Sequence, residues 1–98
     1  MITSKQRAYL RGLANGVPSI CQSGKDGITE NVIKQLDSAL DARELVKSNV
    51  LDNAPCTAKE ACNSVAAQLS AEPVQVIGKV FVIYRQSKDE KKRAITLK

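Results

Sequence analysis

The sequence predicts one small α/β domain: a two-layer α-β-α-β-α-β-β fold with a four-stranded mixed sheet. Helical and strand-like apolar periodicities alternate along the chain, and glycine and proline fall at the boundaries between them. The 98 residues are 43% hydrophobic but hold only two Tyr, one Phe and no Trp, which indicates a single aliphatic core. Two helical crossovers should make their flanking strands parallel, and the last strand should return antiparallel. Residues 1–98 are therefore expected to form one domain, with a basic C-terminal segment from about residue 86.

Three segments have the pattern of capped amphipathic helices. Thr3 and Gln6 have the spacing of a capping box at the start of the first, and Thr29 is a good N-cap for the second. Thr57 and Glu60 form a second capping box before the third, where apolar residues recur at i, i+3 and i+4. The predicted helices span residues 3–14, 29–42 and 57–69.

Four short segments are typical of strands. In the second of them, Val46 and Val50 should face one side of the sheet and Lys47 and Asn49 the other. The last two segments are rich in β-branched residues and are separated only by Gly78-Lys79, which indicates a hairpin with a very tight turn. The predicted strands span residues 19–23, 45–51, 74–77 and 80–84.

The candidate working site is the loop from Gly24 to Gly27, which leads out of a strand into the helix capped by Thr29. Both glycines can take a positive φ and let another backbone approach closely. The N–H groups and the positive dipole end of the following helix favour an anion, and Lys25 adds a mobile cation. The competing interpretation is that the two glycines only close a tight turn between strand and helix.

The net charge of +5 is concentrated at the two ends of the chain. Residues 1–11 hold three basic residues and no acid, and residues 85–98 hold six basic residues against two acids. The stretch between them holds six basic and eight acidic residues. In the first helix, Arg7 and Arg11 are four residues apart and so share one face. This segregation indicates a polyanionic partner, although a basic tail can also simply be solvated.

The residue inventory offers little for catalysis. The chain has no histidine, which removes the commonest general base and metal ligand, and no carboxylate pair has an obvious placement in a cleft. Cys21 and Cys62 have the pattern of small buried hydrophobes, while Cys56 is expected to be the most exposed thiol. We therefore expect no enzyme, no cofactor, no metal and no small-molecule substrate.

No apolar run approaches membrane-spanning length, and the N-terminus is polar where a signal peptide would be apolar. Three cysteines, an odd number in a short chain, fit a reducing compartment better than a disulfide scaffold. The expected location is the cytoplasm, and a monomer is the default expectation.

Several motifs, in register over essentially the whole chain, resemble those of the CRM domain, the chloroplast RNA splicing and ribosome maturation domain. The chain is similar to the stand-alone bacterial form of this domain, the YhbY-like proteins. The segments that carry it are Lys5-Gln6-Arg7 with Leu10-Arg11, Gly24 to Glu30, Ala39 to Lys47, Val74 to Lys79, and Val82 to Arg85.

The resemblance implies a fold like the C-terminal domain of bacterial translation initiation factor three, with an extra N-terminal helix. It implies non-catalytic binding of structured RNA, namely ribosomal RNA or large-subunit precursors during ribosome assembly. The GxxG loop corresponds to the RNA-contacting loop of KH domains, and basic residues elsewhere supply further contacts. Since stacking aromatics are lacking, shape should matter more than base sequence. The expected RNA-binding residues are Lys5, Arg7, Arg11, Gly24, Lys25, Asp26, Gly27, Thr29, Lys47 and Arg85.

The chain departs from the family pattern at a few positions. Asp26 places a carboxylate in the loop and partly cancels Lys25, unless it bonds a nearby N–H as in an Asx turn. Asn49 stands where a basic residue is expected beside Lys47. Ser23 and Ser48 replace residues that are usually apolar, at an expected cost to core packing.

Two other classes of function stay open at this point. One is a protein-interaction module whose basic surface binds acidic protein partners, with an affinity that survives Gly24→Asp and Gly27→Asp. The other is a thiol or metal protein, although the cysteine spacing matches no zinc pattern.

Overall fold

The computed structural model describes residues 3–86, apart from the side chain of Cys21. The basic C-terminal segment lies almost entirely outside the described residues. All predicted helices and strands are present in the predicted order, and each boundary is within two residues of its prediction. The elements are α1 (Ser4–Ala14), β1 (Ser19–Ser23), α2 (Glu30–Arg43), β2 (Leu45–Val50), α3 (Ala58–Leu69), β3 (Glu72–Ile77) and β4 (Val80–Tyr84).

The predicted side-chain caps fix the helix starts. The Thr3 hydroxyl accepts a hydrogen bond from the N–H of Gln6 at 3.1 Å, and the Gln6 side chain accepts one from the N–H of Thr3 at 2.9 Å. Thr57 and Glu60 repeat this capping box before α3, and the hydrogen bond from the N–H of Thr57 to the Glu60 carboxyl holds the pKa of that carboxyl below its ordinary value. The Thr29 hydroxyl accepts from the N–H of Val32 at 3.2 Å, which caps α2 as predicted.

The four strands form one mixed sheet in the order β1-β2-β4-β3. β1 and β2 are parallel across the α2 crossover, and β4 is antiparallel to both of its neighbours. β2 and β3 therefore run in the same direction, as the second crossover predicts, with β4 inserted between them. Because β4 is an inner strand covered on both faces, Phe81 and Ile83 are fully buried on one face and Val82 on the other.

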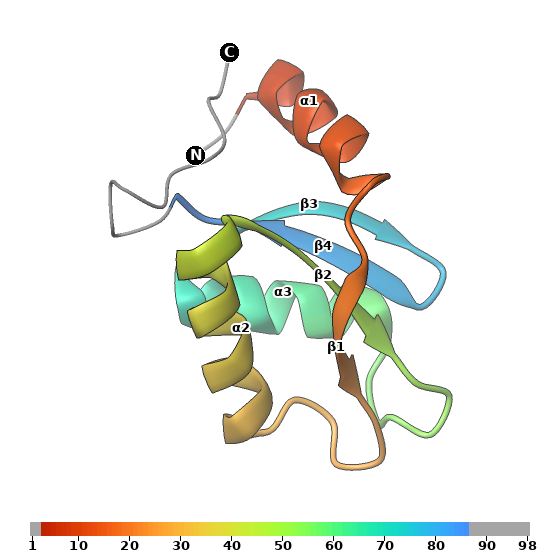
Figure 1. Ribbon diagram of the computed structural model, residues 1–98. Coiled ribbons are helices and arrows are strands. Elements are labelled where there is room, and N and C mark those ends of the chain that lie inside the picture. The colour runs from red at the N-terminus through yellow and green to blue at the C-terminus, as the bar shows by residue number, and fades with distance from the viewer. Residues whose placement is uncertain (1–2, 87–98) are drawn as a thin grey trace.

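Helices cover both faces of the sheet (Figure 1). α2 and α3 pack on one face, around Leu36, Val65 and Phe81. α1 crosses the opposite face, where Leu10 and Ala14 are buried with Val82 and other strand residues in a smaller cluster. Among the described residues the second cluster contains six buried ones, against eleven in the first, so α1 is a partial layer and leaves part of this face open. We call this face, on which α1 lies, the α1 face.

Two serines lie within the core that faces α2 and α3. Ser48 occupies the middle of the row that runs from Val46 to Val50, and both Ser48 and Ser23 are fully buried. The Ser23 hydroxyl has no hydrogen-bond partner among the described residues. A buried hydroxyl without a partner is costly, and within the described residues this cost falls on Ser23.

The two thiols whose surroundings are described differ in exposure. Cys62 is fully buried on α3, and burial raises its pKa to about 11. Cys56 is half-buried, which makes it the more exposed of these two thiols, as the sequence indicated.

At pH 8 we expect iodoacetamide to alkylate Cys56 at least about tenfold faster than Cys62, because the thiolate is the reactive form and burial suppresses it. Trypsin cleavage after Lys59 separates the two cysteines, so mass spectrometry of the peptides gives both rates. In concentrated urea the two rates should converge. Equal rates in the native chain would contradict the buried position of Cys62.

Candidate nucleic-acid interface

Three predicted RNA-binding cations come from α1, and they differ in their surroundings. Lys5 and Arg11 are exposed, and neither makes an ion pair or a side-chain hydrogen bond with another described residue. Arg7 is half-buried, and its Nε donates a hydrogen bond to the carbonyl oxygen of Pro73 at 3.2 Å. One donor of Arg7 therefore bonds α1 to β3, whereas Lys5 and Arg11 can bind a ligand.

Lys47 and Arg43 add positive charge next to α1. Lys47 points to the α1 face of β2, as the alternation predicted, and lines a pocket with Asn15, the residue that follows α1. Arg43, in the last turn of α2, lines a hollow with Leu13 of α1 and Leu45. The sequence analysis missed Arg43. The sequence feature that could have indicated Arg43 is its position two residues before Leu45, which is buried beneath α1.

The glycine loop is a closed turn. The N–H of Gly27 donates to the carbonyl oxygen of Gly24 at 2.8 Å, and Lys25 and Asp26 lie exposed at the tip. Gly27 has a φ of +69°, whereas Gly24 does not adopt a positive φ. Gly27 is buried against Pro55, so the loop is packed as well as exposed. The competing interpretation of a tight strand-to-helix turn therefore describes its geometry well, and an anion could still meet its tip.

α1 and the glycine loop lie far apart. Figure 1 places α1 at one end of the molecule and the loop, between β1 and α2, at the other. The structure brings Lys5, Arg7 and Arg11 together on α1, with Lys47 near its C-terminal end, but it does not bring Lys25 or Thr29 to them. A ligand that touches both sites must extend along the molecule rather than occupy one compact site.

Arg85 has a different environment from the other predicted RNA-binding residues. Its side chain is only 12% exposed and points to α2 and α3. Its guanidinium pairs with Asp37 at 2.8 Å and Asp41 at 3.1 Å, and it donates to the carbonyl oxygens of Leu69 and Asp37 at 3.0 and 3.1 Å. These contacts join the end of β4 to both helices. We therefore leave Arg85 out of the interface proposed below.

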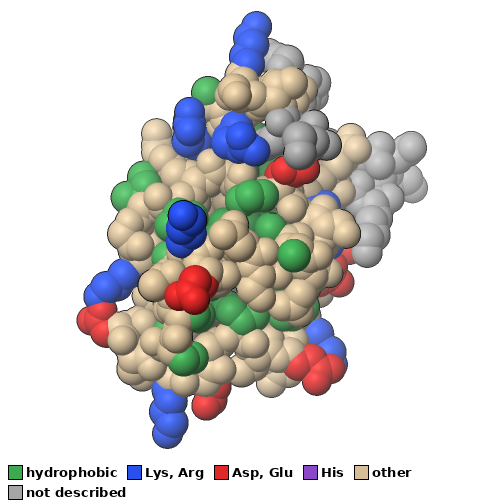
Figure 2. All heavy atoms as spheres, turned by 180° about the vertical axis from the view of Figure 1, so that it is seen from behind, with side chains coloured by type: hydrophobic (Ala, Val, Ile, Leu, Met, Phe, Trp, Pro, Cys, Tyr) green, Lys and Arg blue, Asp and Glu red, His purple; other side chains and the backbone are tan. Residues whose placement is uncertain are grey.

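Charge is partitioned between the two sides of the molecule. Beyond Arg85, the described ion pairs join Lys34 to Glu30 on α2, at 3.5 Å, and Lys79 to Asp52 between two loops. Lys5, Arg11 and Lys47 on the α1 side, by contrast, have no carboxylate partner among residues 3–86. Figure 2 shows Lys and Arg side chains gathered at the end where Figure 1 places α1, with an acidic side chain beside them, and both signs mixed at the other end.

The described part of the chain contains neither a cluster of metal ligands nor a membrane-spanning helix. Among residues 3–86, no three His, Cys, Asp or Glu side chains cluster as metal ligands would. No helix in this range has the length and apolar character that crossing a bilayer requires.

The fold and this surface define a small basic α/β domain with a cationic α1 side. The chain belongs to the CRS1/YhbY (CRM) domain family, whose model matches residues 2–85, and the resemblance seen in the sequence motifs is thereby confirmed.

The relatives cover almost the whole chain. The Bacillus subtilis protein named "Probable RNA-binding protein YqeI" is 38% identical over 91 residues, which are 93% of this chain and 95% of that protein. A Haemophilus influenzae protein named "RNA-binding protein" is 32% identical over 90 residues, which are 92% and 91% of the two chains. The solution structure of SAV1595 from Staphylococcus aureus is 46% identical, has a TM-score of 0.79, and matches over 98% of this chain and 100% of its own.

Proposed function

We propose that this protein binds structured RNA without catalysing a reaction and that it contacts mainly the phosphate backbone. The observation that carries the proposal is the set of cations on and beside α1 that have no carboxylate partner among residues 3–86, foremost Lys5, Arg11 and Lys47. Cations without carboxylate partners can neutralise phosphates and release counterions, which is the main source of affinity in such complexes. Relatives over nearly the full chain bear the name RNA-binding protein, which supports RNA over other polyanions.

The glycine loop has a secondary part in this proposal. Lys25 stands at its exposed tip, and the N-terminus of α2 behind Thr29 favours an anion. Asp26 lies beside Lys25 at the same tip and opposes its charge. The loop is therefore a weaker contact than α1. An RNA bound to α1 reaches the loop when it lies lengthwise along the molecule.

The proposed target is ribosomal RNA or a precursor of the large ribosomal subunit, bound by a monomer in the cytoplasm. This finer assignment rests on the family resemblance of the sequence motifs. The α1 side suits such a target, because its cations come from separate elements and can follow a folded backbone rather than one base sequence.

The test is equilibrium binding to a fluorescent stem-loop of large-subunit ribosomal RNA. If four phosphates are neutralised, the affinity should fall about 100-fold between 50 mM and 200 mM salt. A glutamate-rich peptide of equal charge serves as the competitor and should displace the RNA only weakly. Tight binding of the peptide without binding of the RNA would favour a module for acidic protein partners. Failure to bind RNA at any salt concentration would overturn the proposal.

A further inference from the structure

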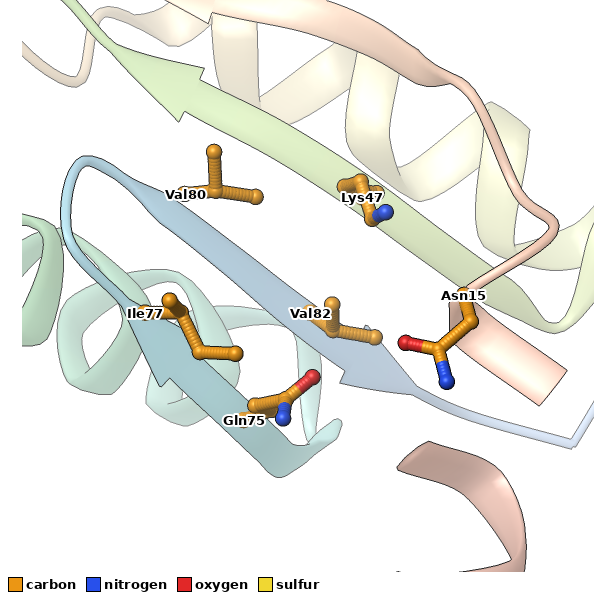
Figure 3. A pocket seen from close by; sticks show the side chains of 6 residues that line it. All are labelled: Asn15, Lys47, Gln75, Ile77, Val80 and Val82. Atoms are coloured by element: carbon orange, nitrogen blue, oxygen red, sulfur yellow. The ribbon is translucent and has the colours of Figure 1, made fainter. Parts of the chain in front are cut away.

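The open part of the α1 face contains a pocket of about 220 Å³ beside the end of α1. Figure 3 shows its lining side chains on one side of the sheet, with Val82 between Lys47 and Gln75, and Asn15 next to it. We call it the Val82 pocket. Its lining residues are Asn15, Lys47, Gln75, Ile77, Val80 and Val82.

Strand register explains this arrangement. Lys47 pairs with Val82 across β2 and β4, and Gln75 pairs with Val82 across β3 and β4, so the three residues form one row across the sheet. The next row contains Val80 with Ile77. Neighbouring strands lie about 4.8 Å apart, so the backbones of β2 and β3, which carry Lys47 and Gln75, lie about 10 Å apart on either side of an apolar floor. That spacing accommodates a flat ring between them.

The polar groups around the floor have no internal partners. The amides of Asn15 and Gln75 and the ammonium of Lys47 make no hydrogen bond or ion pair with other residues in the described range. Ile77, at the rim, is 62% exposed although its side chain is large and apolar. An apolar floor ringed by unused amides and a cation is complementary to a ring that has polar edges and a phosphate nearby.

The pocket size restricts what can fill it. An engineered protein cavity of about 150 Å³ holds one benzene, and drug-sized ligands occupy about 300 to 1,000 Å³. At about 220 Å³ the pocket has room for one planar ring system and little more.

We propose that the Val82 pocket binds one unpaired nucleobase of the RNA. The base lies against Val80 and Ile77, above the buried Val82, the amides of Gln75 and Asn15 meet its polar edge, and Lys47 meets the phosphate beside it. This inference rests on the proposed RNA binding and adds a site that reads a base. No aromatic side chain lines this pocket. Hydrogen bonds to the edge of the base therefore provide the contact that aromatic stacking provides in other RNA-binding proteins.

The test compares three RNA hairpins with identical stems: one fully paired, one with a single adenosine bulge and one with an abasic bulge. Adenosine is the probe, because Asn and Gln amides pair with adenine through a donor and an acceptor at once. We expect the native chain to bind the adenosine bulge at least about 5-fold more tightly than the abasic bulge. Gln75→Ala and Asn15→Ala should each reduce this preference to less than about twofold, while the salt dependence stays.

Gln68→Ala, an exposed position on α3 away from the α1 face, is the matched control and should keep the full preference. Thermal unfolding checks that each variant is folded. If Gln75→Ala is unstable, the result for Asn15→Ala, which lies at an exposed helix end, provides the test. Equal, salt-dependent affinity of the native chain for the adenosine and abasic bulges would overturn the base site alone. A preference that persists in both variants would also overturn it, and binding of none of the hairpins would overturn the proposed function as well.

Discussion

Replacing Arg85 by alanine is expected to lower the free energy of unfolding by about 2 to 4 kcal/mol. The guanidinium is 12% exposed and supplies ion pairs to Asp37 and Asp41 and hydrogen bonds to two helix carbonyl oxygens. Alanine would leave those carbonyl oxygens without their donor and would remove the link between β4 and the two helices. The estimate stays below that for a fully buried pair, because Asp37 and Asp41 remain partly exposed to water.

Urea unfolding of Arg85→Ala, Arg85→Lys and Lys34→Ala measures this effect. Arg85→Lys keeps the charge but cannot reach four acceptors at once, so it should fall between Arg85→Ala and the native chain. Lys34→Ala removes an exposed pair and should change stability by less than about 0.5 kcal/mol. If Arg85→Ala has the same urea midpoint of unfolding as the native chain, the contacts described for Arg85 contribute nothing to stability. If the folded variant loses RNA affinity, Arg85 belongs to the interface after all.

Replacing Gly27 by alanine is expected to cost about 2 to 3 kcal/mol, which is the second largest effect. Gly27 has a φ of +69°, a backbone conformation that is unfavourable for residues with a Cβ. A methyl group there would also lie only 3.0 Å from Cγ of Pro55. The turn closed by the bond from Gly27 to Gly24 would have to shift, and with it the start of α2.

Gly24→Ala is the matched control, because its φ is not positive and an added methyl group meets nothing closer than 3.5 Å. Its stability should stay within about 0.5 kcal/mol of the native value. Thermal unfolding of the two variants therefore separates the roles of the glycines. Equal losses would contradict the geometry described for the turn. The difference also means that Gly24 and Lys25, rather than Gly27, are the positions at which RNA contact can be tested without unfolding the loop.

Local sequence patterns predicted most of the fold. The capping boxes at Thr3 and Thr57 involve residues three apart, so they can be recognised without knowledge of the rest of the chain. The two crossovers predicted parallel strands for a similar reason, since chirality and chain length restrict how such a connection closes. The alternation in β2 likewise placed Lys47 on the face opposite Val46.

Long-range packing decided what local patterns could not. The role of Arg85 depends on Asp37 and Asp41, which precede it by more than forty residues. The separation of α1 from the glycine loop depends on which sheet face α1 covers, and periodicity does not specify that face. Arg43 was missed for the same reason, because it lies near α1 in space but not in sequence.

The central claim is that RNA lies on the α1 side, and the most direct measurement is the salt dependence of RNA affinity in two double variants. Lys5→Ala with Arg11→Ala removes two exposed cations from α1, and Lys34→Ala with Lys59→Ala removes two exposed cations from α2 and α3. The α1 double variant should make the slope of log affinity against log salt shallower by about 2, and the second double variant should leave it unchanged. Equal slopes for the native chain and the α1 double variant would contradict the claim that RNA lies on the α1 side. A change of slope in the second double variant alone would contradict it as well.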